Sequence, residues 1–228
     1  MGLNHGTNIV KDGLVFQVDA ANPRSYPRSG ATVTDLINNV EGTINSATFQ
    51  NINAGVFNFD GTNDYININP GASSTIDLTS FTISAWVKWT NSASSYGTAI
   101  RLSTSGDDIW MYVGRSTGFN FGVRFYLGST LLDDTDFLPT DEWKHIVVRF
   151  QNSGNSLKVY VDGQEKVSST ANKNPSLWNT TSANQIGANG NGGERMYGDI
   201  SNIQIYNRAL SAAEIKQNYN ALKSRFGL

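Results

Sequence analysis

The chain of 228 residues contains no cysteine, which excludes disulfide bonds, thiolate zinc sites, iron–sulfur clusters and cysteine nucleophiles. It has two histidines, too few for a histidine-rich metal site. Charged residues make up 16% of the chain and the net charge is −2, so no basic field exists to attract nucleic acid or an anionic membrane. No apolar run approaches the ~20 residues that span a bilayer. We therefore expect neither nucleic acid nor a membrane as a partner.

One domain is expected over residues 1–228. All-β sandwiches often exceed about 200 residues as a single unit, and a chain of this length can bury roughly 70% of its unfolded surface without a metal or disulfide. Residues 1–12 are expected to form a polar N-terminal arm that packs little against the domain. The 22 glycines and 11% aromatic residues are typical of short strands joined by tight turns.

Apolar and polar side chains alternate through three segments, residues 81–89, 109–113 and 119–127. A period of two predicts β-strands with one buried face. Other compact apolar or alternating runs predict further strands at residues 14–18, 56–59, 65–68, 143–150, 157–161, 165–168 and 197–206.

Two turn signals indicate hairpins. Residues 60–63 read Asp-Gly-Thr-Asn and separate the expected strands 56–59 and 65–68. The pair Asp162-Gly163 separates the expected strands 157–161 and 165–168, and Asp-Gly is among the strongest short hairpin signals. Both pairs of strands are therefore predicted to be hydrogen-bonded neighbours.

The C-terminal segment predicts a helix. Ser211 is a suitable N-cap, and Glu214 three residues later completes a capping box. Leu210 and Ile215 can form the hydrophobic staple that fixes the entry of the chain. One apolar stripe follows at i, i+4 and i+7, formed by Ile215, Tyr219 and Leu222. About a dozen strands and this helix predict an all-β fold, a two-sheet antiparallel jelly-roll sandwich with a short C-terminal helix.

Five segments, in order, resemble the motifs of LamG-like domains of the concanavalin A-like lectin/glucanase superfamily. They are residues 57–66 (FNFDGTNDYI), 81–88 (FTISAWVK), 142–147 (EWKHIV), 157–163 (LKVYVDG) and 206–211 (YNRALS). The resemblance covers nearly the whole chain and implies the same sandwich fold.

The two ends carry a narrower resemblance. Residues 13–27 and 212–228 resemble the opening and the ending of LamG-like proteins of tailed phages. This resemblance implies a virion structural protein, a head decoration or a tail-associated component, whose partners are other virion proteins and which is oligomeric on the particle. Residues 1–6 lack the basic and apolar regions of a secretion signal, so we expect synthesis in the host cytoplasm and localisation in the virion.

The superfamily contains glycoside hydrolases, whose glucanase branch carries Glu-x-Asp-x-(x)-Glu on one strand, but this sequence has no such motif. Asp134 and Asp136 would share a strand face, although their cluster is more typical of a solvated loop. His145 lies inside an expected strand without a signature serine and is interpreted as a strand histidine among polar neighbours. Residues 187–193 are glycine-rich but match no phosphate loop. We expect no catalytic residues and no enzymatic activity.

Calcium is left open. The resemblance implies that many relatives carry calcium, yet the usual Asp-Glu pair after the last-strand isoleucine is here Ser201-Asn202 after Ile200. No cofactor is therefore expected, and a structural calcium ion remains an alternative to ordinary turn capping by carboxylates. The carboxylates at expected strand ends are those of Asp19, Asp60, Asp64 and Asp199.

Alternation also predicts a binding face. If the apolar positions of the strands face the core, the opposite positions present Trp86, Trp110, Tyr112, Arg124 and Tyr126. Aromatic rings beside arginine suit either a sugar or a protein hot spot. His145 and Arg149 would join this face in one phase of their strand. The alternative is that a second layer or the C-terminal helix buries these aromatics.

The ligand- or partner-binding residues predicted from this face are Trp110, Tyr112, Arg124 and Tyr126. The favoured hypothesis is a non-catalytic phage virion protein that docks to other virion proteins through this face or through the N-terminal arm, with glycans as further ligands. The first alternative is a free carbohydrate-binding lectin module, and the second is a glycoside hydrolase.

Overall fold

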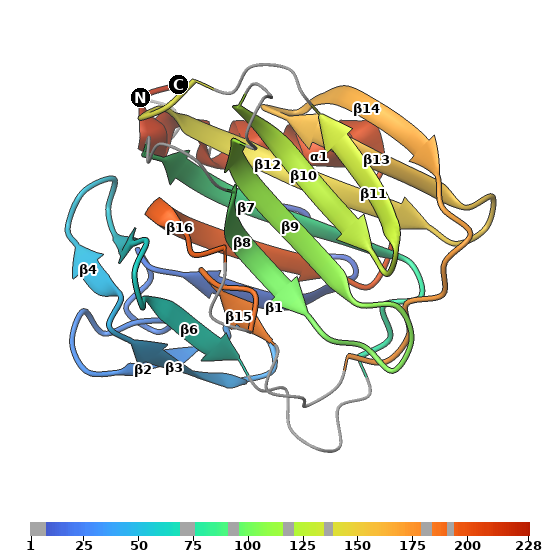
Figure 1. Ribbon diagram of the computed structural model, residues 1–228. Helices are drawn as coiled ribbons and strands as arrows, with labels where there is room; N and C mark the ends of the chain where they lie inside the picture. The colour runs from blue at the N-terminus through green and yellow to red at the C-terminus, as the bar shows by residue number, and fades with distance from the viewer. Residues whose placement is uncertain are drawn as a thin grey trace.

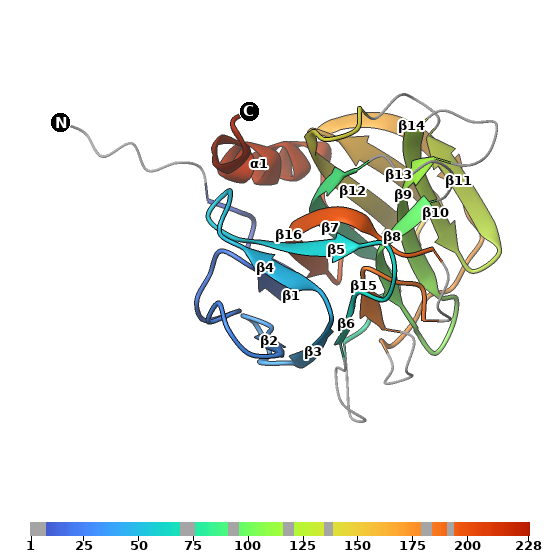
Figure 2. The ribbon, with the colours of Figure 1, turned by 60° about the vertical axis from the view of Figure 1, so that its left-hand side comes forward.

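The computed structural model describes residues 8–68, 76–90, 96–115, 121–134, 139–178, 184–190 and 194–228. These residues form two antiparallel β-sheets packed face to face and a C-terminal helix (Figures 1 and 2). The expected all-β, two-sheet sandwich is therefore confirmed. Within the described residues, no helix is both long and apolar enough to cross a membrane.

The back sheet, which lies behind the other in Figure 1, is built around β7 and β16. One edge of β16 has two partners: its first half pairs with β5, and its second half pairs with β1. Its strands in spatial order are β14 (Gln164–Thr170), β13 (Ser156–Val161), β12 (Trp143–Gln151), β7 (Phe81–Trp89), β16 (Tyr197–Tyr206), β5 (Val56–Asp60) and β4 (Thr48–Gln50), with β1 (Leu14–Asp19) beside β16.

The front sheet presents β8 to β11 toward the viewer in Figure 1. Its long strands are consecutive in the chain and pair as a meander. In spatial order it contains β11 (Thr130–Asp134), β10 (Phe121–Leu127), β9 (Ile109–Arg115), β8 (Tyr96–Leu102), β15 (Gln185–Ile186), β6 (Tyr65–Ile68), β3 (Glu41–Asn45) and β2 (Thr32–Thr34).

The main core lies between the sheets and contains the alternate residues that the sequence pattern assigned to it. Phe81 of the back sheet lies with its ring centroid 6.1 Å from that of Phe125 of the front sheet. Phe16 packs edge-on against Trp178 at 5.3 Å, and both side chains are fully buried. Burial of such side chains stabilises the fold by about 1.5–3 kcal/mol each.

All of the expected strands occur, and three have the expected bounds: β6, β7 and β16. β10 begins at Phe121, and the expected start at residue 119 lies outside the described residues. The sequence pattern missed β2, β3, β4, β8, β11 and β15. Most of these strands are short or polar, so they carry too few alternating positions to be recognised.

One predicted hairpin is confirmed and the other is wrong. β13 and β14 pair through Asp162 (φ 52°) and Gly163 (φ 74°), both in the left-handed region that a two-residue hairpin turn requires. Residues 60–63 instead lead from β5 in the back sheet to β6 in the front sheet. Among those four residues only Gly61 has a positive φ, so this turn makes a corner between the sheets.

Helix α1 (Ala212–Leu222) continues into the 3-10 helix η1 (Lys223–Phe226). The predicted capping box is present: Ser211 Oγ accepts from Glu214 N at 3.3 Å, and Glu214 Oε2 accepts from Ser211 N at 2.8 Å. Arg208 also holds the Glu214 carboxylate with two hydrogen bonds of 2.6 and 3.1 Å, and this contact lowers the pKa of Glu214 to about 2. The start of the helix is therefore held by the capping box and by the contact of Arg208 with Glu214.

The C-terminal helices cover the outer face of the back sheet (Figure 2). Trp86 is fully buried there, with Phe226 stacked at 4.2 Å and Tyr219 at 5.8 Å. His145 lies beside it, with its ring centroid 5.1 Å from that of Trp86. The expectation that Trp86, and in one phase His145, share the exposed aromatic face is wrong, because they belong to the other sheet and the helix buries them.

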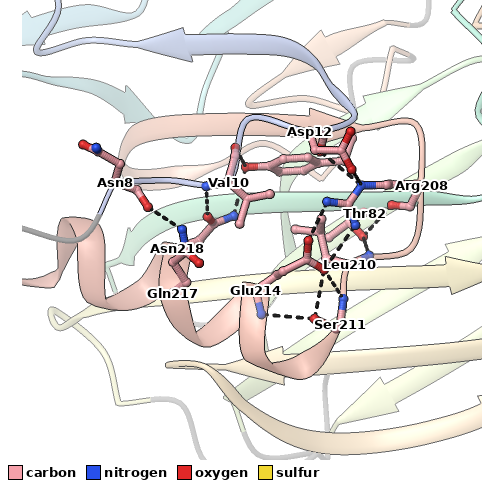
Figure 3. A network of polar contacts seen from close by, with 11 residues as sticks. Asn8, Val10, Asp12, Thr82, Arg208, Leu210, Ser211, Glu214, Gln217 and Asn218 are labelled. Carbon is pink, nitrogen blue, oxygen red and sulfur yellow. Dashed lines mark hydrogen bonds and ion pairs between the residues drawn. The ribbon is translucent and has the colours of Figure 1, made fainter.

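Residues 8–12 pack against the C-terminal helix (Figure 3). Val10 N donates to Asn218 Oδ1 at 2.8 Å, and Gln217 Nε2 donates to Asn8 O at 2.8 Å. Arg208 forms an ion pair with Asp12 at 2.8 Å. The expected arm over residues 1–12 is therefore wrong for its second half, because this segment bonds to the buried Asn218 of α1 and places Val10 in a hydrophobic cluster with Ile215. Residues 1–7 lie outside the described residues, and the arm stays a prediction there.

Candidate functional site

The four predicted binding residues lie together on the outer face of the front sheet. In β9, Ile109, Met111 and Val113 face the core, so Trp110 and Tyr112 point outward. In β10 the same alternation turns Arg124 and Tyr126 outward. The register places Trp110 opposite Tyr126 and Tyr112 opposite Arg124. The sequence prediction of this grouping therefore agrees with the geometry.

Four aromatic rings form a continuous group, here called the aromatic cluster: Tyr96, Trp110, Tyr112 and Tyr126. The ring centroid of Trp110 lies 5.7 Å from that of Tyr126, with 57° between the planes. Tyr112 contacts Tyr126 edge-on at 5.9 Å and Trp110 edge-on at 6.4 Å. Tyr96 adds a fourth ring 6.4 Å from Tyr112. Edge-on and tilted contacts of this kind are the favourable arrangements of aromatic pairs.

The members of the aromatic cluster differ in exposure. Tyr112 is only 2% exposed and forms the floor of the group. Burial raises its pKa, and a hydrogen bond from its hydroxyl to the carboxylate of Glu194 acts in the same direction. Trp110 and Tyr126 are half-buried and keep part of their surface in solvent. Trp110 and Tyr126 therefore provide the accessible ring surface of the aromatic cluster, and Tyr112 lies beneath them.

Two arginines lie against the aromatic rings. The Arg124 guanidinium carbon is 4.2 Å from the ring centroid of Tyr96. The Arg124 side chain can extend to Tyr96 because Gly114 and Gly122, which face each other in the next row of the sheet, have no side chains. Arg101 lies over Trp110 at 5.0 Å. Its guanidinium also forms an ion pair with Asp108 at 3.3 Å and donates to the backbone carbonyl of Asn189. Stacked guanidinium groups present planar N–H donors at the edge of an aromatic surface.

Sequence reasoning missed three contributors to this face: Tyr96 and Arg101 of β8, and Glu194. A register shift between Thr98 and Ile100 breaks the alternation of β8, so its outward residues do not follow a period of two. Glu194 lies in the segment between β15 and β16, where no periodic signal exists. The Asn-Gly-rich composition nearby was the only signal that could have drawn attention to it.

No described helix or strand covers the aromatic cluster. The helices lie on the opposite side of the sandwich, behind the back sheet (Figure 1). Leu131 of β11 stands opposite Tyr126 in the register and is 42% exposed. The face therefore presents an apolar row across three strands, formed by Trp110, Tyr126 and Leu131.

The carboxylates considered for calcium have other partners. Asp19 forms an ion pair with Arg225 at 2.7 Å, and Asp199 forms one with Lys88 at 2.8 Å. Asp60 and Asp64 both accept backbone N–H groups of the corner between β5 and β6. Within the described residues, no group of three or more His, Asp or Glu side chains could hold a metal ion.

The candidate catalytic residues do not form an accessible site in the described part of the chain. His145 Nε2 lies 2.8 Å from Ser84 Oγ, but both side chains are 1% exposed beneath α1 and η1. Burial also lowers the pKa of His145 to about 3. Among the described residues its Nδ1 has no hydrogen-bond partner, so no third group there orients the ring as in a catalytic triad. Asp136 and the side chain of Asp134 lie outside the described residues.

Among solved structures, the chain is similar in fold to domain 4 of AbnA, a GH43 extracellular arabinanase from Geobacillus stearothermophilus in complex with arabinotriose. The two share 19% identity over 90% of this chain and 98% of that one, with a TM-score of 0.67. Trypanosoma rangeli sialidase with the inhibitor DANA matches at 16% identity and a TM-score of 0.67, over 95% of this chain and 34% of the sialidase. The receptor-binding domain of botulinum neurotoxin D matches at 17% identity and a TM-score of 0.67, over 91% and 52%.

This chain therefore spans about a third of the sialidase and about half of the neurotoxin structure. These likenesses establish the fold, and none of the three is a phage protein. No curated protein sequence matches the chain. Residues 60–216, well over half of the chain, match the family profile described as the concanavalin A-like lectin/glucanases superfamily. The chain belongs to the concanavalin A-like lectin/glucanase superfamily.

Proposed function

We propose that this domain is a non-catalytic glycan-binding module whose site is the aromatic cluster of the front sheet. One observation carries the proposal: the outward aromatic residues are buried on the back sheet but keep exposed surface on the front sheet. Trp86 on the back sheet is buried by α1 and η1, whereas Trp110 and Tyr126 on the front sheet keep exposed surface. Half-buried rings that no described helix covers keep surface that can stack on the apolar face of a sugar.

The polar groups around these rings suit sugar hydroxyls. Arg101 supplies N–H donors beside Trp110, and Glu194 supplies acceptor oxygens beside Tyr112. A small number of placed polar groups around an apolar surface is the usual composition of a ligand site. The register fixes the rings on rigid strands, so little conformational entropy is lost when a ligand stacks on them.

Two of the structural relatives support this proposal. The arabinanase domain, almost all of which this chain covers, was solved with arabinotriose. The neurotoxin domain is a receptor-binding domain. Each has the same fold as this chain, and a binding role transferred from them depends on the presence here of an exposed aromatic face.

The virion role is the second candidate, and it rests on the resemblance of residues 13–27 and 212–228 to phage proteins. Both segments pack into the domain: the first contains β1, and the second contains α1 and η1. A virion location, assembly in the host cytoplasm and oligomeric contacts with other virion proteins stay predictions. Detection of this chain by mass spectrometry in purified phage particles tests them, and its absence from particles would reject them.

Replacement of Trp110 by alanine is expected to weaken glycan binding strongly on an array of plant, bacterial and animal oligosaccharides. Central aromatic contacts contribute about 2 kcal/mol or more, so we expect a loss of roughly 30-fold or more in affinity. Tyr126→Ala is expected to act in the same direction. Ile52→Ala is the control, because Ile52 is 42% exposed and lies between β4 and β5, away from the front sheet. Glycan binding that survives Trp110→Ala unchanged would reject the site.

No hydrolysis is expected when the domain is incubated with β-glucans, arabinans and other polysaccharides. Glycosidases need two carboxyl groups about 5–9.5 Å apart with a free proton or lone pair. Near the aromatic cluster, the carboxylate oxygens of Asp108 already accept hydrogen bonds from Arg101, Ser103 Oγ and the backbone N–H of Thr104. Reducing-sugar release above the buffer level, lost in Asp134→Asn or Asp136→Asn, would show that the domain is an enzyme.

A further inference from the structure

Glu194 has an unusual backbone conformation for a residue with a side chain. Its φ is 50°, in the left-handed region that favours glycine. Its carbonyl accepts hydrogen bonds from both the backbone N–H and the hydroxyl of Thr98, each 2.8 Å long. These two contacts hold the strained residue against β8. Such strain persists where the surrounding contacts impose it, and it is frequent at ligand sites.

The side chain of Glu194 is held as firmly as its backbone. Its Oε2 accepts from Asn189 Nδ2 at 2.8 Å, and the hydroxyl of Tyr112 donates to the same carboxylate. An ionised carboxylate offers about four acceptor positions, of which these contacts use two. Glu194 is exposed, so the remaining positions face solvent beside the aromatic cluster.

No ion pair among the described residues includes Glu194, and the next residue, Arg195, lies over the ring of Tyr65 at 5.3 Å. Arg101, which lies on the same side of the face, forms its ion pair with Asp108. Arg124 stands at the other end of one row across the sheet, where the order is Arg124, Tyr112, Thr98 and then Glu194. The end of the face next to β8 therefore carries a fixed negative charge.

From these contacts we infer that Glu194 is the specificity-determining residue of the site and that it selects neutral sugars. This inference rests on the proposed glycan-binding function. Hydroxyl groups of a sugar stacked on Trp110 or Tyr126 donate to the open acceptor positions of the Glu194 carboxylate. Uronic and sialic acids carry a negative charge that Glu194 repels, so they bind beside Glu194 less tightly than neutral sugars.

The test uses the parent domain and two variants on one array that holds matched neutral and acidic oligosaccharides. Glu194→Gln keeps the shape and one acceptor oxygen and removes the charge. Glu194→Gly removes the whole side chain and suits the positive φ, so its thermal unfolding temperature is expected not to fall. A hydrogen bond to a charged group contributes about 1.5–3 kcal/mol, so affinity for neutral glycans is expected to fall about 10- to 100-fold in Glu194→Gly. In Glu194→Gln, acidic glycans are expected to gain affinity relative to neutral ones.

The outcomes separate this inference from the proposed function. Binding of neutral glycans that depends on both Trp110 and Glu194 supports both. Binding that depends on Trp110 but favours acidic glycans in the parent, or is unchanged in both Glu194 variants, overturns the role of Glu194 and leaves the glycan-binding function standing. A parent domain that binds no glycan, or binds one independently of Trp110, overturns the proposed function.

Discussion

Ile215→Ala is expected to lower the free energy of unfolding by about 2–5 kcal/mol, the usual cost of truncating a fully buried aliphatic side chain. Ile215 lies near the start of α1, and its side chain has no exposed surface. It packs in a second hydrophobic cluster outside the main core, with Val10, Leu14, Val147, Tyr160, Tyr206 and Leu210. This cluster joins the N-terminal segment, the back sheet and the helix, so the cavity left by alanine would weaken all three contacts.

Urea unfolding measures this effect, and two variants in the same helix serve as controls. Asn220 is exposed, so Asn220→Ala is expected to stay within about 0.5 kcal/mol of the parent. Ser211→Ala removes the N-cap acceptor and is expected to cost about 1 kcal/mol. Equal stability of Ile215→Ala and the parent would show that α1 does not dock as the structure has it.

Acidification from pH 7 to pH 4 is expected to destabilise the domain by about 3 kcal/mol through His145 alone. Burial lowers the pKa of His145 from 6.5 to about 3. Between these values the unfolded chain binds a proton at this residue and the folded chain does not, so stability is lost as the pH falls through this window. Each pH unit within it costs about 1.4 kcal/mol. Above pH 6.5, His145 is uncharged in both the folded and the unfolded chain and no longer lowers the stability of the domain.

The matched variant is His145→Gln, which has no charge in either state. Urea unfolding at several pH values between 7 and 4 is expected to give a smaller slope of stability against pH for the variant. The slopes are compared because His145→Gln also changes the contacts with Ser84 and Trp86. Other groups, such as Glu214 with its pKa lowered to about 2, titrate alike in both proteins. Parallel slopes would contradict the burial of an uncharged His145.

Local patterns in the sequence predicted those parts of the fold and site that depend on local periodicity. Alternation within β9 and β10 placed Trp110, Tyr112, Arg124 and Tyr126 on one face, because successive side chains of a strand point to opposite sides. The capping box fixed the start of α1 within one residue. Each of these signals is contained in fewer than about ten neighbouring residues, the length of a single strand or of about three helix turns.

Local patterns left open those features that depend on contacts between distant segments, such as the alternative that the C-terminal helix buries the outward aromatics. Trp86 follows the same alternation as Trp110, but nothing near it shows that Phe226 will cover its ring. Val10 lies in a segment that reads as a polar arm, and its contacts with Asn218, Tyr206 and the cluster around Ile215 make that segment part of the domain. Glu194, which lies between β15 and β16, depends on a backbone conformation that Thr98 of β8 holds through two hydrogen bonds. In each case the deciding partner is far away in the sequence.

A crystal structure of the domain with the glycan that binds most tightly on the array tests the central claim most directly. We expect a sugar ring stacked on Trp110 or Tyr126 on the outer face of the front sheet, with at least one hydroxyl within hydrogen-bond distance of Glu194. A sugar bound at the edge strands, or beside α1 on the back sheet, would contradict it.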